Sequence, residues 1–301
     1  MILLYHNIVP DIQPYRRWCI GQALPLFYLK RQITWLSKYF KILPLDEYLS
    51  RKNPNRGISR YISITFDDGL KSSFQYASSI LQELCVPATF FVSTTHLENG
   101  NLLWFSYLNA LCFEGVYTEI FVCNQVIKLE SEEQCKQARF TLEKLAKESG
   151  DPVIFCQDLM KGYPLPSAVH DLYVGMTSAQ IQSADRSGIF TIGSHTKTHP
   201  YLSQKSPEDQ MKEIYESKEI LTYLCHKPID YFAYPGGDYN RTSILLVKEA
   251  KFRAAFSVVP DRLNVDPSYE IGRVGIYSPS MVKLFFKLIG VNQIRQRFYK
   301  F

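Results

Sequence analysis

Residues 61–69 of the chain read Tyr-Ile-Ser-Ile-Thr-Phe-Asp-Asp-Gly. Their apolar residues alternate with polar ones, a period of two that predicts a β-strand over 61–66 and a turn at Gly69. Apolar residues then recur at helical spacing over 74–84, and 88–92 is again a short apolar run. Strand, helix and strand in this order are typical of a parallel β-α-β unit, so the stretch predicts an α/β fold.

The same alternation continues in both directions along the chain. Short apolar runs predict further strands, and the amphipathic stretches between them predict helices. The strand candidates are residues 2–5, 40–43, 189–192, 231–234 and 254–259, and the helix candidates are 29–39, 207–224 and 242–250. Repeated βα units favour a parallel sheet, either open or closed into a barrel.

One section, from about Leu97 to Met176, breaks this alternation. It contains a hairpin candidate at 116–129 and a charged helix candidate at 131–148. We interpret it as an insertion between two core βα units, either a lid over the site or a packing subdomain that does not contact substrate. The expected division is a core of residues 1–96 and 177–279, an insertion of 97–176 and a tail of 280–301.

The composition is that of an ordinary globular protein. Of the 301 residues, 46% are hydrophobic and 21% charged, and no run approaches the ~18 apolar residues of a membrane span. The net charge is +5, and residues 280–301 alone carry five basic residues and no acidic one. The remainder is therefore near neutral, which argues against a nucleic-acid partner.

The cysteines and the N-terminus bear on the compartment. Seven cysteines are scattered without a Cys-x-x-Cys motif, which is typical of reduced thiols in a cytosol and not of a disulfide framework or a zinc knuckle. Residues 1–6 lack the basic start and the small-residue cleavage site of a signal peptide. We therefore expect a cytoplasmic protein.

Two adjacent carboxylates, Asp67 and Asp68, follow the strand over 61–66 directly. The loops after parallel strands are where the active sites of such folds lie. Two ionised carboxylates this close repel each other unless a cation or a proton lies between them. The alternative interpretation is a helix N-cap next to a solvated aspartate, because this sequence is common at strand–helix turns.

A second polar motif, Ser-His-Thr-Lys-Thr-His at 194–199, also follows an apolar strand candidate. In a helical turn His195 and His199 face the same way, and two imidazoles can then reach one metal ion at about 2.0–2.1 Å. The pair alone is equally consistent with a structural role. Together with a strand-end carboxylate it forms a set that leaves open positions for water and substrate, which favours a catalytic metal site.

These motifs together resemble the NodB-type polysaccharide deacetylases, carbohydrate esterase family four. The resemblance rests on residues 65–69, 87–92, 194–199 and 232–237, and it covers roughly 1–96 and 177–275. It implies a distorted (β/α) barrel of about seven strands with a divalent metal at the carboxyl ends of the strands. Zinc is the first expectation, and cobalt, nickel and iron are alternatives.

The resemblance assigns roles residue by residue. Asp67 is similar in position to the general base, and Asp68, His195 and His199 are similar to the metal ligands. The backbone N–H of Gly236 stands where the family stabilises the oxyanion. Three further residues are expected to contact substrate, namely Tyr234, Pro235 and Trp104, although aromatic residues at helical spacing are more often part of a core.

The sequence departs from the family pattern at two places. The chain has no histidine after His226 to act as the general acid, but His6 ends the first strand candidate. This resembles the circularly permuted members, and His6 is expected to be the acid; the alternative is a histidine that caps a strand. Ala233 holds the place of an arginine that pairs with the base, and Arg273 is expected to supply that charge to Asp67 unless it is structural.

The function that the resemblance implies is metal-dependent hydrolysis of the N-acetyl amide of an N-acetylated amino sugar, in a polysaccharide, an oligosaccharide or an intermediate of glycan assembly. A deformylase acting on a lipid-linked formamido sugar would use the same chemistry. A catalytically inactive sugar-binding relative is the alternative from another class. A complete set of base and ligands argues against it, because a binding protein needs neither.

The tail, residues 280–301, mixes basic residues with large apolar ones. A basic amphipathic helix of this kind can lie on an anionic membrane surface, so peripheral contact at the inner face of the membrane is one expectation. The other is a terminal helix that packs on the barrel with its basic residues outward.

Overall fold

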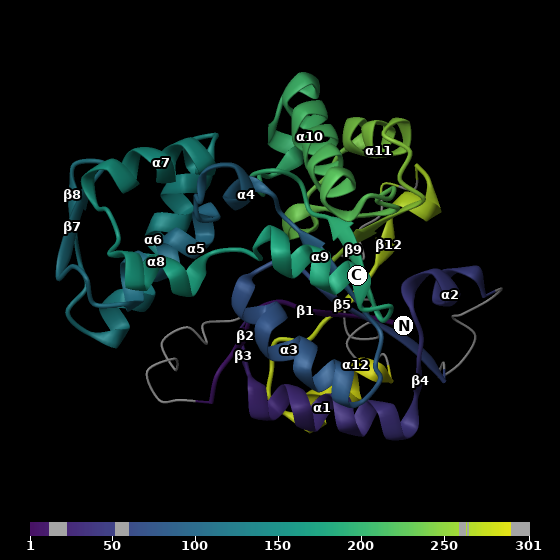
Figure 1. Ribbon diagram of the computed structural model, residues 1–301. Helices are drawn as coiled ribbons and strands as arrows, with labels where there is room; N and C mark the ends of the chain where they lie inside the picture. Colours follow the sequence, from purple (N-terminus) through teal and green to yellow (C-terminus); the bar gives the residue numbers. More distant parts are fainter. Residues whose placement is uncertain (12–22, 52–59, 259–262, 264, 290–301) are drawn as a thin grey trace, which may run out of the picture.

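The computed structural model describes residues 1–11, 23–51, 60–258, 263 and 265–289. Its central element is a parallel sheet whose strands lie in the order β12-β11-β10-β9-β6-β5-β1-β13 (Figure 1). These strands are β1 (Ile2–Tyr5), β5 (Tyr61–Phe66), β6 (Ala88–Val92), β9 (Phe190–Ser194), β10 (Tyr231–Ala233), β11 (Ala254–Ser257), β12 (Ile271–Gly272) and β13 (Val274–Gly275).

The sheet closes on itself through its last two strands. Only Arg273 separates β12 from β13 along the chain, and β12 pairs with β11 while β13 pairs with β1. With β12 and β13 counted as one interrupted strand, seven positions follow one another around the ring. The α/β barrel of about seven strands expected from the sequence is therefore confirmed. β4 (Lys41–Ile42) pairs beside this ring, with the first residues of β5.

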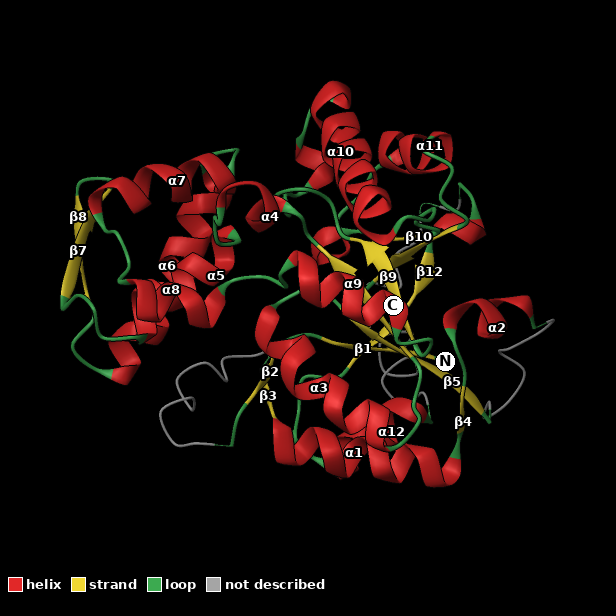
Figure 2. Cartoon of the chain, in the orientation of Figure 1, coloured by secondary structure: helices red, strands yellow, loops and turns green. Residues whose placement is uncertain are grey.

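Helices cover the outside of the barrel (Figure 2). Outward-facing side chains of β5, such as Ile64 and Phe66, join one apolar core with Leu29 of α1 and Phe74 of α3. The helices around the barrel are α1 (Leu26–Tyr39), α2 (Leu45–Ser50), α3 (Lys71–Glu83), α9 (Ser178–Arg186), α10 (Pro207–Cys225), α11 (Arg241–Glu249) and α12 (Met281–Leu288). The shorter elements are β2 (Ile8–Val9), β3 (Leu24–Pro25), η2 (Leu202–Gln204), η3 (Pro235–Gly237) and η4 (Pro267–Tyr269).

The alternate side chains of the strands form a second apolar cluster inside the barrel. Ile2, Phe91, Ala233 and Phe256 come from four different strands and are all buried in it. Gly193 of β9 leaves room for one of these rings, since a Cβ atom at this position would lie 2.5 Å from a ring carbon of Phe91. Because the interior is filled with apolar side chains, the barrel is a packed core and not a pore.

Between β6 and β9 the chain leaves the barrel and forms a second body beside it, drawn in teal in Figure 1. Its helices α5, α6, α7 and α8 and its hairpin share an apolar core of their own. The elements of this section are α4 (Thr95–Asn99), α5 (Trp104–Phe113), β7 (Glu119–Val122), β8 (Gln125–Lys128), α6 (Glu132–Glu148), α7 (Pro152–Gly162) and α8 (Ser167–Tyr173). We call α5 to α8 and the hairpin the insertion.

The tail begins with α12, which packs on the barrel. Leu284 and Leu288 are buried in the main core, whereas Val282 and Phe285 are exposed. Residues 290–301, which carry the rest of the tail prediction, lie outside the described residues. Contact of this tail with a membrane stays a prediction. Within the described part of the chain, no helix combines the length and the apolarity that a membrane span requires.

Candidate active site

Asp67 and Asp68 lie at the carboxyl end of β5, and both are buried. The backbone turns sharply here, because Asp68 has φ +71° and Gly69 has φ +66°. A Cβ atom at position 69 would lie 2.8 Å from Val92, so only glycine fits this turn. A left-handed conformation at an aspartate costs free energy, and such strain is typical of functional sites. The turn places the two carboxylates side by side facing the end of the barrel.

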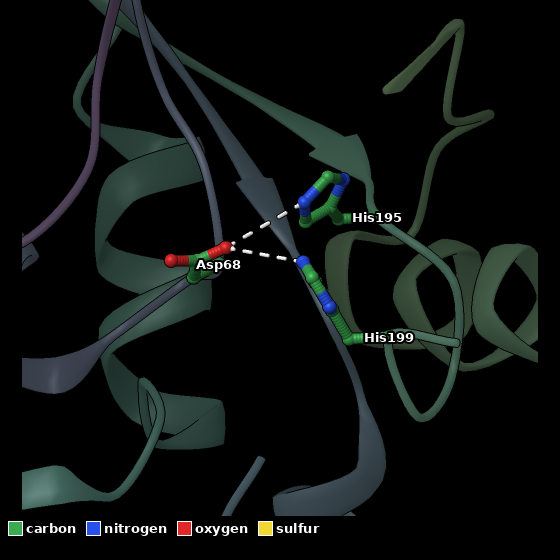
Figure 3. A group of neighbouring side chains, drawn as sticks. All are labelled: Asp68, His195 and His199. Atoms are coloured by element: carbon green, nitrogen blue, oxygen red, sulfur yellow. Dashed lines mark ion pairs between the residues drawn. The ribbon is translucent and has the colours of Figure 1, made fainter. Parts of the chain in front are cut away.

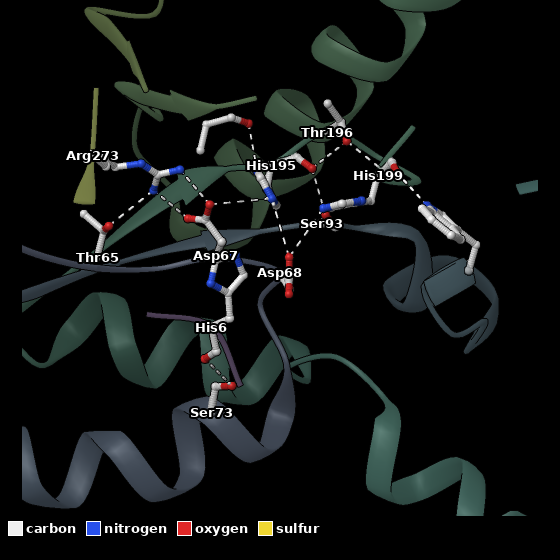
Figure 4. Close-up of polar contacts among 12 residues, drawn as sticks. His6, Thr65, Asp67, Asp68, Ser73, Ser93, His195, Thr196, His199 and Arg273 are labelled. Carbon is white, nitrogen blue, oxygen red and sulfur yellow. Dashed lines mark hydrogen bonds and ion pairs between the residues drawn. The ribbon is translucent and has the colours of Figure 1, made fainter. Parts of the chain in front are cut away.

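The partner of Asp67 is Arg273, in the break between β12 and β13. The guanidinium donates two hydrogen bonds of 2.6 Å, one to each carboxylate oxygen, and a third of 3.2 Å to Thr65 Oγ1 (Figure 4). Burial alone would raise the pKa of Asp67. The Arg273 guanidinium, with His195 as a smaller contribution, outweighs burial and holds the pKa of Asp67 below its ordinary value. Asp67 is therefore ionised.

His195 follows β9, and its orientation is fixed by a backbone carbonyl. Its Nδ1 donates to Ala233 O at 2.8 Å, so a neutral imidazole presents the lone pair of Nε2. This Nε2 lies 3.6 Å from Asp68 Oδ1 and 3.9 Å from Asp67 Oδ2. The main-chain carbonyl of Ala233 thus orients the His195 ring.

His199 approaches Asp68 from the same loop. Its Nε2 lies 3.4 Å from Asp68 Oδ1, and its ring lies 4.9 Å from that of His195 (Figure 3). The residue has φ +60°, and its backbone N–H donates to Thr196 Oγ1 at 3.1 Å. Burial lowers the pKa of His199, which favours the neutral imidazole that a metal ligand requires.

Asp68, His195 and His199 fit a divalent cation. One ligand atom of each residue lies within 4.8 Å of the others, and the group is the one set of this kind among the described residues. Burial would raise the pKa of Asp68, but the two neighbouring histidines outweigh it and lower that pKa. An ionised carboxylate with two imidazoles, one of them oriented by a carbonyl, is a donor set typical of zinc and related metals.

Two residues of other elements hold the loop that carries these histidines. Glu213 of α10 accepts backbone N–H groups of Lys197 and Thr198 at 2.9 and 2.8 Å, and the Thr198 hydroxyl at 2.5 Å. Trp104 of α5 donates its indole N–H to His199 O at 2.9 Å. The sequence analysis did not find Glu213, because nothing in the amphipathic pattern of α10 separates it from the other acidic residues of this helix.

His6 lies at the end of β1, in the same cavity as Asp67 and Asp68 (Figure 4). Its Nδ1 is buried and has no hydrogen-bond partner among the described residues. The ring lies 5.4 Å from that of Tyr277. Burial lowers the pKa of His6, although both aspartates act in the opposite direction. Burial thus favours the neutral imidazole of His6, which lies next to the carboxylates.

The remaining candidates divide into two groups. Gly236, with φ +60°, and Trp104 line the cavity. Tyr234 and Pro235 do not: the Tyr234 ring is fully buried in the main core and stacks on Tyr239 with ring centroids 4.4 Å apart. Of the residues expected to contact substrate, Gly236 and Trp104 therefore line the cavity, whereas Tyr234 and Pro235 lie outside it. Arg273 lies behind Asp67 and does not itself line the cavity.

The cavity over these residues has a volume of about 380 Å³, within the range of ligand pockets. Its floor comes from the barrel and includes His6, Asp67, Asp68, His195, His199 and Gly236. One wall comes from the insertion and includes Trp104, Phe105, Asn109, Arg139, Phe140 and Glu143. The insertion and the barrel therefore build this cavity together.

A parallel barrel with a carboxylate pair and two histidines at the carboxyl ends of its strands is an arrangement suited to metal-assisted hydrolysis. The family model described as polysaccharide deacetylase matches residues 55–255. The chain belongs to the polysaccharide deacetylase family. The match includes both aspartates and both histidines of the site, but it contains neither His6 nor Arg273.

Individual proteins agree with this assignment. The Bacillus subtilis protein YxkH, whose name places it among the polysaccharide deacetylases, is 27% identical over 107 residues, which are 35% of this chain and 38% of YxkH. The Streptococcus pyogenes deacetylase PplD, solved with acetate, has a TM-score of 0.62 and 17% identity over 96% of both chains. IcaB from Ammonifex degensii has a TM-score of 0.60 and 16% identity over 96% of both chains. At these identities the solved structures show the fold alone.

Proposed function

We propose that this protein is a metal-dependent N-deacetylase that hydrolyses the N-acetyl amide of an amino sugar within a glycan. The observation that carries the proposal is the arrangement at the carboxyl end of β5. There an ionised, arginine-paired Asp67 lies directly beside the Asp68–His195–His199 set, in one cavity of about 380 Å³. A base next to a complete ligand set is what amide hydrolysis requires and what sugar binding alone does not.

Asp67 acts as the general base. Asp68, His195 and His199 would hold a divalent ion, zinc before cobalt, nickel or iron, and this ion would supply polarisation of the amide carbonyl and activation of water. Asp67 accepts the proton of the attacking water, and Arg273 keeps the carboxylate ionised and fixes its direction through two hydrogen bonds. Because Arg273 acts through Asp67, it is a positioning residue.

His6 acts as the general acid. An amine leaves only after protonation, so the proton that Asp67 takes from water passes to the neutral His6 imidazole, which donates it to the amine nitrogen as the C–N bond breaks. The His6 ring is buried in the cavity, and its Nδ1 has no hydrogen-bond partner among the described residues. His6 lies near the start of the sequence, whereas Arg273 lies near its end. The products are acetate and a free amino sugar, and the N–H of Gly236 is the proposed donor to the oxyanion.

This arrangement argues against the hypothesis that the protein is a catalytically inactive, sugar-binding relative. The residue at position 233 is not the arginine of the family, but Arg273 makes the same kind of contact with Asp67 from the neighbouring strand. Deformylation would use the same residues, so the released acid, formate or acetate, distinguishes the two reactions.

The test is acetate and formate release by protein loaded with zinc, with and without a chelator. The substrates are N-acetylglucosamine oligomers, nucleotide-linked N-acetylglucosamine and a lipid-linked formamido sugar. We expect chelator-sensitive acetate release, and a loss of about 10²–10⁴-fold in kcat for Asp67→Asn with metal binding retained. Formate as the only acid would identify a deformylase, and stoichiometric metal without release of either acid would contradict the proposal.

A further inference from the structure

The helices α1 and α12 are neighbours on the outside of the barrel. In the chain α1 lies after β1 and α12 lies after β13, and these two strands pair with each other. Gln32 of α1 donates to Ser278 O at 2.9 Å, two residues before Ser280, which caps α12. Both helices lie on the lower side of the barrel in Figure 1. Their outer faces therefore belong to one side of the molecule.

The inner face of each helix belongs to the main core, and the outer face carries further large apolar residues. Leu29, Ile33 and Leu36 of α1 are buried, as are Leu284 and Leu288 of α12. The outer apolar residues are between 44% and 64% exposed, namely Phe27, Tyr39, Val282, Phe285 and Phe286. One exposed apolar residue is normal on a protein surface, but several on two neighbouring helices indicate an interaction site.

A groove of about 420 Å³ follows the outer face of α1. Apart from Thr34, its described lining is aromatic or basic, and consists of Phe27, Lys30, Arg31, Trp35, Lys38 and Tyr39. From Phe27 to Tyr39 this stripe is about 18 Å long, because each residue of a helix adds about 1.5 Å. Aromatic rings next to long basic side chains are typical of protein segments that lie in the headgroup region of a membrane.

The charges of α1 and α12 are not balanced within these helices. Together the two helices carry five basic residues and no aspartate or glutamate. On α6, by contrast, Lys136, Lys144 and Lys147 each pair with a glutamate four residues away. On α10, Lys212 pairs with Glu208 in the same way. The outer face of α1 and α12 is therefore positive, whereas α6 and α10 present cations that already have partners.

Three of the five cations are available to a binding partner. Lys30 pairs with Glu83 of α3 at 3.1 Å, and Lys287 donates to the backbone oxygen of Gly275. The other three are exposed and have no ion pair among the residues that the structure describes, and these are Arg31, Lys38 and Lys283. They belong to both helices, so the free positive charge is spread over the whole face.

Charge and apolarity together indicate the kind of partner. A nucleic acid would engage the cations and the aromatic rings, but it offers nothing to an exposed aliphatic residue such as Val282. A second copy of this chain would bring like charges together, which is unfavourable. An anionic bilayer offers negative headgroups to the cations and an apolar layer to Val282, Phe285 and Phe286 at the same time.

We propose that α1 and α12 form a docking face for the surface of an anionic lipid bilayer. The inference goes beyond the proposed function and does not depend on it, because no residue of the catalytic site takes part. Docking would also orient the protein. Ala23, three residues before the start of α1, lines the catalytic cavity, so the docking face begins next to this cavity. A protein bound through this face holds the cavity near the bilayer.

The test is flotation of the full chain with vesicles of phosphatidylcholine alone or of an equal mixture of phosphatidylcholine and phosphatidylglycerol. Two double variants change the docking face. Arg31→Glu with Lys38→Glu reverses two of its free charges, and Phe285→Ser with Phe286→Ser removes two of its apolar side chains. Residues 290–301 are the same in every protein, so any contribution from them is common to all.

Two further double variants are matched controls. Lys144→Glu with Lys212→Glu changes the net charge by the same amount, at exposed lysines of α6 and α10. Phe121→Ser with Phe140→Ser removes two exposed phenylalanines of the insertion. Melting temperatures close to that of the wild type show that these surface substitutions leave the fold intact.

We expect the wild type to float with the mixed vesicles and not with phosphatidylcholine alone, and added salt to weaken this binding. Arg31→Glu with Lys38→Glu should weaken it at least about 25-fold, because each cation near such a surface contributes about fivefold. Phe285→Ser with Phe286→Ser should weaken it about tenfold. Both controls should stay within about twofold of the wild type.

Absence of flotation of the wild type, or equal flotation of all five proteins, would overturn the proposal. Two other results would assign the face to a different partner and overturn it as well. One is single-stranded RNA that binds more tightly than the vesicles and is lost from Arg31→Glu with Lys38→Glu. The other is a dimer in sedimentation velocity that Phe285→Ser with Phe286→Ser dissociates. Acetate release enters none of these readouts, so they are independent of the proposed function.

Discussion

At the scale of single residues, the contact between Asp67 and Arg273 keeps a buried carboxylate ionised. Both side chains are almost completely buried, at 2% and 4% exposure, and Arg273 donates two hydrogen bonds of 2.6 Å to Asp67. The guanidinium lies over the rings of Phe91 and Phe256, 5.1 and 5.9 Å from their centroids. A charge in such surroundings is tolerated only while its partner is present.

Arg273→Met is therefore expected to destabilise the protein strongly, because it leaves the Asp67 carboxylate buried without a counter-charge. The expected cost is about 3–5 kcal/mol of unfolding free energy. The double variant Arg273→Met with Asp67→Asn removes the charge as well and should recover most of that loss. Urea unfolding of the two single variants and the double variant measures the coupling. Additive losses would show that the pair does not act as a unit.

At the scale of elements, a helix outside the barrel holds the loop between β9 and α10. Glu213 on α10 accepts two backbone N–H groups and a hydroxyl of the loop that carries His195 and His199. Glu216, one turn further along the same helix, contacts this loop only through the side chain of Lys197, at 2.7 Å. The two glutamates therefore differ in whether they hold the backbone.

Glu213→Ala is expected to weaken zinc binding about 10–100-fold, as loss of outer contacts around metal ligands does. The reason is that the backbone of the loop loses the acceptor that fixes its shape. Glu216→Ala is the matched control and should stay within about twofold of the wild type. Calorimetric titration of zinc into the three proteins decides the matter. Equal affinities for all three would mean that the loop holds its shape without α10.

The junction between the barrel and the insertion is a second feature whose effect on stability can be measured. His96 of α4, before the insertion, donates from Nε2 to the carbonyl oxygen of Met176, after the insertion, at 2.5 Å. Gly175 is required beside it, since a Cβ atom there would lie 2.1 Å from the His96 ring. Burial lowers the pKa of His96 from 6.5, despite the opposing hydrogen bond to Met176.

The unfolding free energy should consequently fall as the pH drops below about 6.5. The unfolded chain takes up a proton on His96 there, and the folded chain resists it, so stability present at higher pH is lost. His96→Gln keeps a donor for Met176 O and removes the titration. Its loss of melting temperature between pH 7.5 and 5.5 should be smaller than that of the wild type. Parallel pH profiles for both proteins would contradict this role of His96.

The sequence predicted what depends on local patterns. The strand ending at Asp67 and the pair His195 and His199 lie in short motifs whose period and spacing are visible in a few residues. Arg273 was predicted because Ala233 stands where the family pattern has an arginine, so another residue had to supply the positive charge beside Asp67. The strands were predicted within one or two residues at most ends, but α9 was not predicted at all, although Thr177 begins it with a capping box.

Contacts between distant segments could not be predicted in the same way. Phe140 and Glu213 are ordinary members of amphipathic helices in the sequence, and only the packing of those helices shows what they face. Tyr234 shows the opposite case. It lies within a motif of the site, but the alternation of β10 turns its ring into the core and leaves Gly236 at the cavity. Motif membership alone does not determine the direction of a side chain.

At the scale of the whole molecule, the ligand set joins parts of the chain that are far apart. Asp68 follows β5, whereas His195 and His199 follow β9, and β6 lies between these strands in the sheet. The whole insertion lies between them in the sequence. An ion that binds these three residues in the folded state therefore stabilises the complete barrel, because the unfolded chain does not hold them together.

Removal of metal should lower the melting temperature of the full chain. Zinc at about 100 times its dissociation constant adds about 2.7 kcal/mol of unfolding free energy, or roughly 5 °C for a protein of this size. Differential scanning calorimetry with zinc and with a chelator measures the difference. Asp68→Asn should remove most of it, and an undiminished shift in that variant would place the bound zinc at another site.

The position of Arg273 between β12 and β13 has a consequence for the order in which the barrel and the site form during synthesis. As the chain leaves the ribosome, β1 emerges early, and its free edge is covered by β13 only after residue 275 has been synthesised. Contacts of such long sequence separation form late. The segment that closes the ring also carries the counter-charge of Asp67, so a nascent chain with an open sheet lacks the guanidinium that keeps this carboxylate ionised. Completion of the barrel and pairing of Asp67 with Arg273 are therefore a single event.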